Sequence, residues 1–154
     1  MTITMHSPIS AIQKVIVATL RGDTTLAGLL APIKNMTPDT PAVVDQPPEG
    51  QLKPYIRVGD NLSIPDHDHT SGGREVTVTL HVWTKERSSK PGQRIADRVT
   101  ELLDHQVASF SAALEVLGHK CVTIRQEFDQ ALEDPDPEIR HHVLRFRIQT
   151  QQLT

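Results

Sequence analysis

Two segments of the chain alternate apolar and polar residues with a period of two. Residues 74–83 do so strictly, and residues 141–149 do so near the end of the chain. Because successive side chains of a strand point to opposite faces, each segment is predicted to be a strand with one apolar and one polar face. The predicted inward residues are Val76, Val78, Leu80, Val82, Leu144, Phe146 and Ile148, and the outward ones are Glu75, Thr77, Thr79, His81, Trp83, Val143, Arg145, Arg147 and Gln149.

Weaker strand signals accompany these two segments. Residues 55–59 alternate, and a short strand is possible at residues 42–44. Residues 122–128 alternate apolar with polar residues, with an interruption at Gln126. Residues 134–137 read Asp-Pro-Asp-Pro, which is a strong turn signal before the last strand.

A helical period occurs twice. Ser7 and Pro8 are typical of a helix start, and Gly22 of a helix end. The apolar stripe between them is Ile9, Ile12, Val15, Ile16, Thr19 and Leu20, and a helical stub at residues 26–30 follows. The second helix opens at residues 88–92, and its stripe is Ile95, Val99, Leu102 and Leu103. Residues 106–120 fit either a short helix or a short strand.

These elements predict an α+β fold. The sheet is expected to be largely antiparallel, possibly mixed, with four or five strands and two main helices on one face. At 154 residues, a single domain over 1–154 is expected, with frayed ends at 1–6 and 150–154. Residues 31–54 hold six of the 11 prolines and are predicted to be an extended loop within that domain.

Charge and composition exclude several classes of protein. The net charge of −3 argues against a general nucleic-acid binder, and no apolar run approaches the length of a membrane span. The amino-terminal residues lack the pattern of a signal peptide, so synthesis in the cytosol is expected. Cys121 is the one cysteine, and no phosphate-binding or nucleophile motif occurs, so no cofactor is predicted.

The most tempting chemistry is the run Asp66, His67, Asp68 and His69. Imidazole and carboxylate groups bind divalent metals, and a small metal-dependent hydrolase using His67 and His69 is an alternative function. However, the run precedes two glycines at a predicted hairpin tip, whereas a metal site needs a rigid scaffold. A solvated loop is therefore favoured, with no metal site and no catalytic residue.

The remaining histidines and arginines have simpler interpretations. His141 and His142 are adjacent in a strand, so they point to opposite faces and cannot act together on one substrate. Arg145 and Arg147, with Arg140 nearby, fit a solvated face, a subunit contact or a surface that binds nucleic acid. The nucleic-acid module is a second alternative function.

The order of several segments resembles the tail-completion or tail-terminator proteins of long-tailed phages and of gene transfer agents. The segments are residues 12–20, 26–30, 44–48, 54–59, 78–84, 92–99, 118–119, 134–136 and 142–147. The resemblance covers nearly the whole chain, and its most specific part is the strand and helix at 78–99. The proline-rich segment 31–54 is longer than the family pattern.

The resemblance implies a mechanical role in a virion. Subunits of such proteins form a ring, typically a hexamer, on the head-proximal end of the tail tube. The implied partners are other copies of the chain, the tail tube protein and the head-completion protein, while DNA passes through the channel without sequence-specific binding and no membrane is involved. We expect the subunit or partner interface to include Asp66, His67, Asp68, His69, Thr77, Thr79, His81, Trp83, Arg145 and Arg147.

Overall fold

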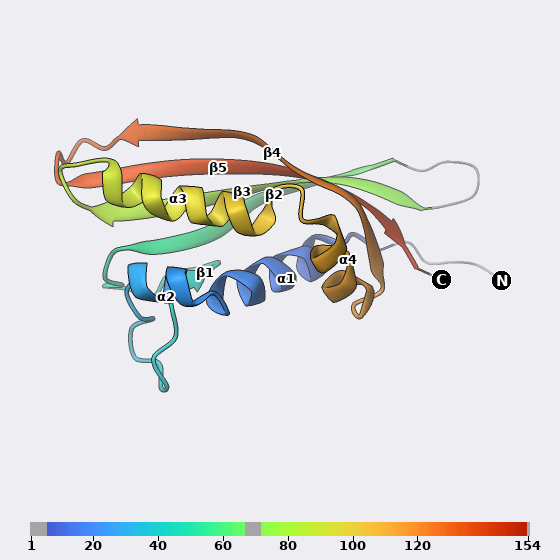
Figure 1. Cartoon of the computed structure of the whole chain (residues 1–154), viewed down its shortest axis with the longest axis horizontal. Helices are drawn as coiled ribbons and strands as arrows, with labels where there is room; N and C mark the ends of the chain where they lie inside the picture. The colour runs from blue at the N-terminus through green and yellow to red at the C-terminus, as the bar shows by residue number, and fades with distance from the viewer. Residues whose placement is uncertain (1–5, 67–71, 154) are drawn as a thin grey trace.

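The computed structural model describes residues 6–66 and 72–153. In chain order its elements are α1 (Ile9–Arg21), α2 (Thr24–Leu29), β1 (Val43–Val44), β2 (Tyr55–Pro65), β3 (Gly73–Lys85), α3 (Lys90–Leu103), α4 (Val107–Glu115), β4 (His119–Glu133) and β5 (Ile139–Gln152). The fold is α+β, as the alternating and helical periods predict (Figure 1).

The five strands form one mixed sheet in the order β1-β2-β3-β5-β4. Three neighbouring pairs, β2–β3, β3–β5 and β5–β4, are antiparallel, and only the two-residue β1 pairs parallel, with β2. The predicted hairpins are therefore present, and β3 and β5 are the two central long strands. The largely antiparallel, possibly mixed sheet of the prediction is confirmed.

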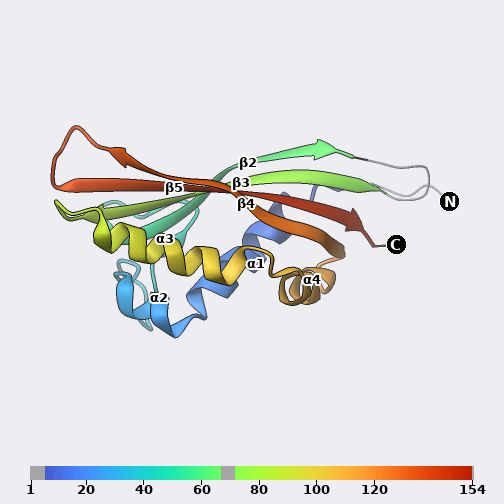
Figure 2. The same ribbon diagram turned by 45° about the horizontal axis from the view of Figure 1, so that its top comes forward.

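All helices lie on one side of the sheet (Figure 2). The helices bury their apolar stripes against the sheet, and the core they form includes Ile12, Ile16 and Leu20 of α1, Ile95, Val99 and Leu103 of α3, and Phe110 and Leu114 of α4. The strands contribute alternate residues: Val76, Val78, Leu80, Val82, Leu144, Phe146 and Ile148 are each at most 1% exposed. The predicted inward set of β3 and β5 is thus the core side of the sheet.

An ion pair joins the short helix α2 to α3. Asp23 caps α2, since its Oδ2 accepts a hydrogen bond from the Leu26 amide at 3.0 Å. The Arg98 guanidinium donates to both oxygens of Asp23, at 2.7 and 3.0 Å. These bonds from Arg98 lower the pKa of Asp23, so the carboxylate stays ionised while it holds the two helices together.

Several boundaries differ from the sequence prediction. Residues 150–152 are not frayed: they belong to β5, Thr150 is 2% exposed, and the Leu153 amide donates to the carbonyl of Gly118. β2 continues past its predicted end at residue 59 to Pro65. Residues 107–115, which the sequence leaves open between helix and strand, form α4. Cross-strand pairing and burial decide these segments, and neither is visible in the local pattern.

Within residues 6–66 and 72–153, no helix has the length and apolar character needed to cross a lipid bilayer.

Candidate functional site

The side of the sheet opposite the helices is uncovered, and we call it the open face (Figure 2). The pairing register assigns alternate residues of each long strand to it. They are Tyr55, Arg57, Leu62 and Ile64 of β2; Glu75, Thr77, Thr79, His81 and Trp83 of β3; Thr123, Arg125, Phe128, Gln130 and Leu132 of β4; and His141, Val143, Arg145, Arg147 and Gln149 of β5. The open face therefore carries most of the polar chemistry of the sheet.

One glutamate forms ion pairs with two arginines of the open face. A β-bulge between Gln126 and Phe128 adds Glu127 to this face, because a bulge re-aims the side chain that it contains. Glu127 lies 2.6 Å from Nε of Arg147 and 3.0 Å from Nε of Arg145. A second carboxylate, Glu75, lies 3.5 Å from Nε of Arg147. Two cations thus meet two carboxylates, and the local charge is balanced.

Arg145 and Arg147 are therefore paired with carboxylates and are not free positive charges of the kind that phosphate binding requires. Arg140, the third arginine of that hypothesis, donates through Nε and Nη2 to the carbonyl of Arg87 at 3.0 and 2.6 Å. The three arginines of that hypothesis thus all make contacts within the subunit.

A second cluster joins three strands of the open face. Nε2 of His81 lies 3.0 Å from Oδ2 of Asp60, and its Nδ1 lies 2.8 Å from Nε2 of His141. The Trp83 ring stacks on His141 with a centroid distance of 3.8 Å and an interplanar angle of 8°. Asp60 reaches His81 because it sits at the β2 bulge with a positive φ of 55°, a conformation that aspartate tolerates.

Burial lowers the pKa of His141 to about 4, with a smaller contribution from the neighbouring His81. His141 is therefore neutral at pH 7. In this form its ring forms a hydrogen bond with His81 and stacks face to face with Trp83. The cluster fixes the orientation of Trp83, so this ring is presented to the outside as a rigid, half-buried side chain rather than a mobile one.

The structure brings together five of the predicted interface residues. Thr79, His81, Trp83, Arg145 and Arg147 share the open face. Thr77 is on the same face but is only 7% exposed, since it lies in register between Leu62 and Arg147. Asp66 is exposed next to Gly73 at the end of the β2–β3 hairpin, and His67, Asp68 and His69 lie outside the described residues.

Sequence reasoning missed the apolar residues at the two margins of the open face. Leu62 and Ile64 are 52% and 48% exposed on β2, and Phe128 and Leu132 are 41% and 36% exposed on β4. The alternation of residues 62 and 64 was the available signal, but the turn-like Gly59, Asp60 and Asn61 before them suggest that the strand has ended. Glu127 was missed as well, because its bulge is visible only as broken alternation.

The other reactive side chains of the described chain are placed for packing. His142 is 2% exposed beneath α3, and burial lowers its pKa. Burial also raises the pKa of Cys121 to about 11, so its thiol is inert at neutral pH. Among residues 6–66 and 72–153, no group of three or more histidine, cysteine or acidic side chains is arranged to hold a metal ion.

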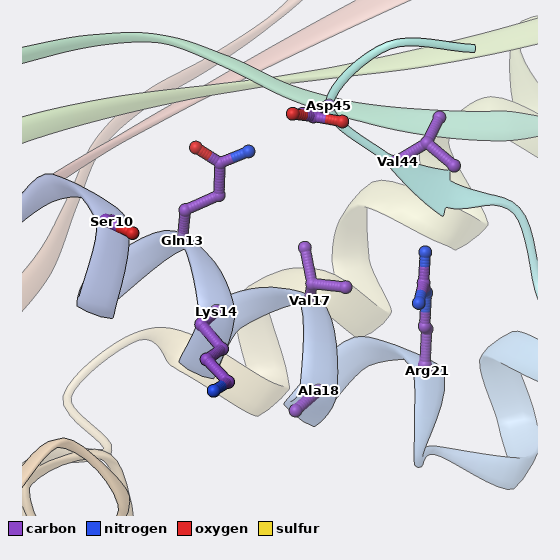
Figure 3. Close-up of a pocket in the computed structure, with 8 residues that line it drawn as sticks. All are labelled: Ser10, Gln13, Lys14, Val17, Ala18, Arg21, Val44 and Asp45. Atoms are coloured by element: carbon purple, nitrogen blue, oxygen red, sulfur yellow. The ribbon is translucent and has the colours of Figure 1, made fainter. Parts of the chain in front are cut away.

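A shallow groove of about 490 Å³ lies between α1 and β1 (Figure 3). Ser10, Lys14 and Asp45 are among its lining residues, but no histidine that could activate the serine is. Arg21 extends toward β1 and donates two hydrogen bonds to the Val43 carbonyl, at 2.8 and 3.0 Å. Arg21 therefore ties α1 to β1 beside the groove.

A family model, a curated relative and a solved structure match this chain. The family model described as "Tail completion protein gp17" matches residues 14–151. Tail completion protein gp17 of Bacillus phage SPP1 is 27% identical over 105 residues, which are 68% of this chain and 73% of that protein. A chain in the virion of a native gene transfer agent (GTA) particle has the same fold, with a TM-score of 0.74 and 20% identity over 96% of this chain and 99% of that one.

Proposed function

Because the chain belongs to the tail completion protein gp17 family, we propose that it is a tail terminator, which caps the head-proximal end of a phage-type tail tube as a ring. The membership itself makes the chain a structural protein of a phage-type tail and not an enzyme, as the sequence predicts. The family match spans residues 14–151, which is nearly all of the described chain.

The proposed mechanism is stoichiometric. A ring of subunits, six in the expected case, binds the end of the finished tube and buries the surface that the next tube subunit would use. Polymerisation stops, and the other side of the ring offers a contact to the head-completion protein. DNA passes through the central channel without sequence-specific binding.

The open face is the observation that carries this proposal. A ring needs two different complementary surfaces on each subunit, because its interface is heterologous. Trp83 and, farther along the same face, Arg145 and Arg147 are of the residue types that most often anchor protein interfaces. The ion pairs of Glu127 are already formed in the single subunit, so a partner meets an ordered surface and loses little side-chain entropy on binding.

Substitution of Arg145 tests the role of the open face. Arg145→Glu places a second carboxylate beside Glu127, and the repulsion changes a half-exposed surface rather than the core. We expect the variant to remain folded by circular dichroism but to fail in ring formation or in the joining of tails to heads. The matched control is Arg94→Glu, which makes the same charge change at an exposed position of α3. Normal assembly of Arg145→Glu would contradict the assignment of this face.

Removal of the whole protein tests the function. Electron microscopy of lysates that lack the chain is expected to show overlong tails or tails without heads. Tails of normal length, joined to heads in normal number, would show that the chain does not terminate them.

A further inference from the structure

We propose that neighbouring subunits of the ring join through the edges of their sheets. Residues 128–133 of β4 pair in the antiparallel sense with residues 59–65 of β2 in the next copy of the chain. This inference rests on the proposed function, because it takes a ring of identical subunits as its starting point. The proposal states which strand edge contacts which in the ring, and ring formation by itself does not determine this.

The first observation is that the chain covers only part of the β2 edge. β1 pairs with residues 56 and 57 of β2, and the Ile56 amide donates to the carbonyl of Ala42 at 2.8 Å. Beyond this point, residues 59–65 have β3 on one side and, within the described chain, no strand on the other. An uncovered strand edge presents backbone N–H and C=O groups that can pair with another strand.

The second observation is that the β4 edge is covered in one half and open in the other. The connection between α3 and α4 satisfies the edge at its middle, because the Gln126 amide donates to Asp104 Oδ1 at 2.8 Å and the His105 amide donates to the Ile124 carbonyl at 3.0 Å. Residues 128–133 follow this covered stretch and are all exposed. In the described structure, β5 is their one neighbouring strand.

The two open edges match each other in chemistry. On the open face each edge carries a pair of exposed apolar side chains, Leu62 with Ile64 and Phe128 with Leu132. Their burial against each other is the kind of apolar contact that stabilises an interface.

The opposite side of each edge carries complementary charge. Beside β2, Arg74 lies next to Ser63, with 3.4 Å between Nη1 and Oγ, and its buried Nε has no hydrogen-bond partner in the described chain. On β4 the acidic residues Asp129 and Glu133 face the same side, in register with Leu144 and Arg140. Edge pairing would bring these carboxylates toward Arg74 of the next subunit.

The strand directions permit a ring. β2, β3, β5 and β4 alternate in direction, so β4 runs opposite to β2 within one subunit. Rotation about an axis roughly along the strands keeps these directions, and β4 therefore meets the next subunit's β2 in the antiparallel sense. Because the two edges differ, each pairing leaves one free edge of each kind. The series closes into a ring when the rotation between neighbouring subunits divides a full turn.

The open segments lie toward opposite ends of the sheet, with the end of β4 at the left of Figure 1 and the end of β2 at the right. The strands must therefore be tilted to the ring axis, as they are in closed barrels. The open faces of successive subunits would then form one continuous surface.

Cysteine pairs test this contact in assembled particles. Particles are produced with the double variant Leu62→Cys/Leu132→Cys or Ile64→Cys/Leu132→Cys, which sample neighbouring registers, then oxidised and run on non-reducing gels. Cys121 is not expected to form a disulfide, because it is 2% exposed and burial raises its pKa to about 11. The controls are each single variant and the pair Leu132→Cys/Val116→Cys, since Val116 is 85% exposed but follows α4 and belongs to neither open strand edge.

We expect at least one of the two double variants to give a ladder of linked subunits, whereas the single variants and the Val116 pair do not. Assembled rings on tails of normal length without any ladder would overturn the edge pairing and leave the terminator function standing. A dimer from Leu132→Cys alone would overturn it in favour of β4 pairing with itself. Absence of the protein from the tail end would remove the proposed function, and with it this inference.

A charged residue on the edge gives an independent test. Lysine on an open strand edge discourages pairing, and Leu132 is exposed in the single subunit, so Leu132→Lys is expected to fold normally but to lose the ring. The control Val116→Lys is expected to assemble normally. Normal ring formation by a folded Leu132→Lys would contradict the proposal.

Discussion

The two faces of the central strands β3 and β5 are built from alternating residues of the same segments, yet they follow different rules. On the helix side every alternate residue from Val76 to Val82 and from Leu144 to Ile148 is buried and apolar. On the open face the intervening residues are threonine, histidine, tryptophan and arginine, and they are held by ion pairs, hydrogen bonds and ring stacking.

The difference separates folding from function. Burial of apolar area against the helices stabilises the subunit, and its loss would unfold the chain. The open-face contacts are half-exposed and contribute little to stability, but they arrange a surface without flexible charges. Substitutions on the two faces should therefore affect different measurements, even at neighbouring positions of one strand.

The largest difference is expected between Phe146 and Val143 of β5. Phe146 is fully buried, and Phe146→Ala is expected to lower the free energy of unfolding by about 3–5 kcal/mol. Val143→Ala removes a half-buried side chain from the open face and is expected to cost under about 1 kcal/mol. Urea denaturation of both variants measures the contrast. Equal losses would mean that the open face is part of the folding core.

A smaller effect is expected where α3 meets the covered face. An added Cβ at Gly92 would lie 2.4 Å from the His142 ring, so Gly92→Ala is expected to cost about 1–3 kcal/mol through overpacking. In a His142→Ala background the same substitution should cost much less.

Gly28→Ala is the control for this prediction. Gly28 is in α2 and has no neighbour within 4 Å of the added Cβ, so alanine there is expected to stabilise the protein by roughly 0.5–1 kcal/mol. The sign of the two effects, measured by thermal denaturation, separates close packing from helix propensity. Destabilisation by both substitutions would contradict this explanation of Gly92.

The alternation that defines the two faces was readable from the sequence, because a strand with one buried face selects residues by a local rule of period two. The pairing partners were not readable. Val122 and Ile124 both fit the predicted β4 pattern, but Val122 is 42% exposed because the register shifts beside it, whereas Ile124 is buried. The position of a bulge is set by the pairing with the neighbouring strand. The ion pairs of the bulged Glu127 with Arg145 and Arg147 could therefore not be predicted from the sequence.

The residues of the open face could likewise be predicted on the regular strands but not beside the bulges. Its centre, at His81, Trp83, Arg145 and Arg147, lies on the two regular strands and was predicted as an interface. Its apolar margins lie on β2 and β4, after irregular residues that interrupt the pattern. The contact of His81 with His141 across the sheet was not predicted, since sequence spacing does not reveal which strands become neighbours.

Histidines on both faces of the sheet should make the stability of the protein sensitive to acid. Burial lowers the pKa of His141 on the open face and of His142 on the covered face, so the unfolded chain binds these protons more tightly. Stability is therefore full above about pH 6.5, the ordinary histidine pKa, and is lost as the pH falls toward the folded-state values. Asp23 adds a separate loss in a lower range, as the pH falls through its own depressed pKa.

Thermal unfolding between pH 8 and 4 measures this loss. His141→Gln is expected to flatten the decline, because it removes a histidine whose pKa is lowered in the folded state. Around His141 the charged groups His81, Asp134 and His142 act on its titration, and Asp134 partly opposes the shift. An unchanged slope for His141→Gln would place the acid sensitivity on the covered face alone, at His142 and His119.

The smallest effect is expected at the centre of the open face. Glu127→Gln removes the shared carboxylate of Arg145 and Arg147, but the two arginine side chains are 39% and 48% exposed, so solvent screens much of the interaction. The expected loss of stability is about 1 kcal/mol or less, and it should shrink further at high salt. Urea denaturation at low and high ionic strength measures it. A larger, salt-insensitive loss would show that the bulge at Glu127 stabilises the sheet itself, and the open face would then share in folding as well as in assembly.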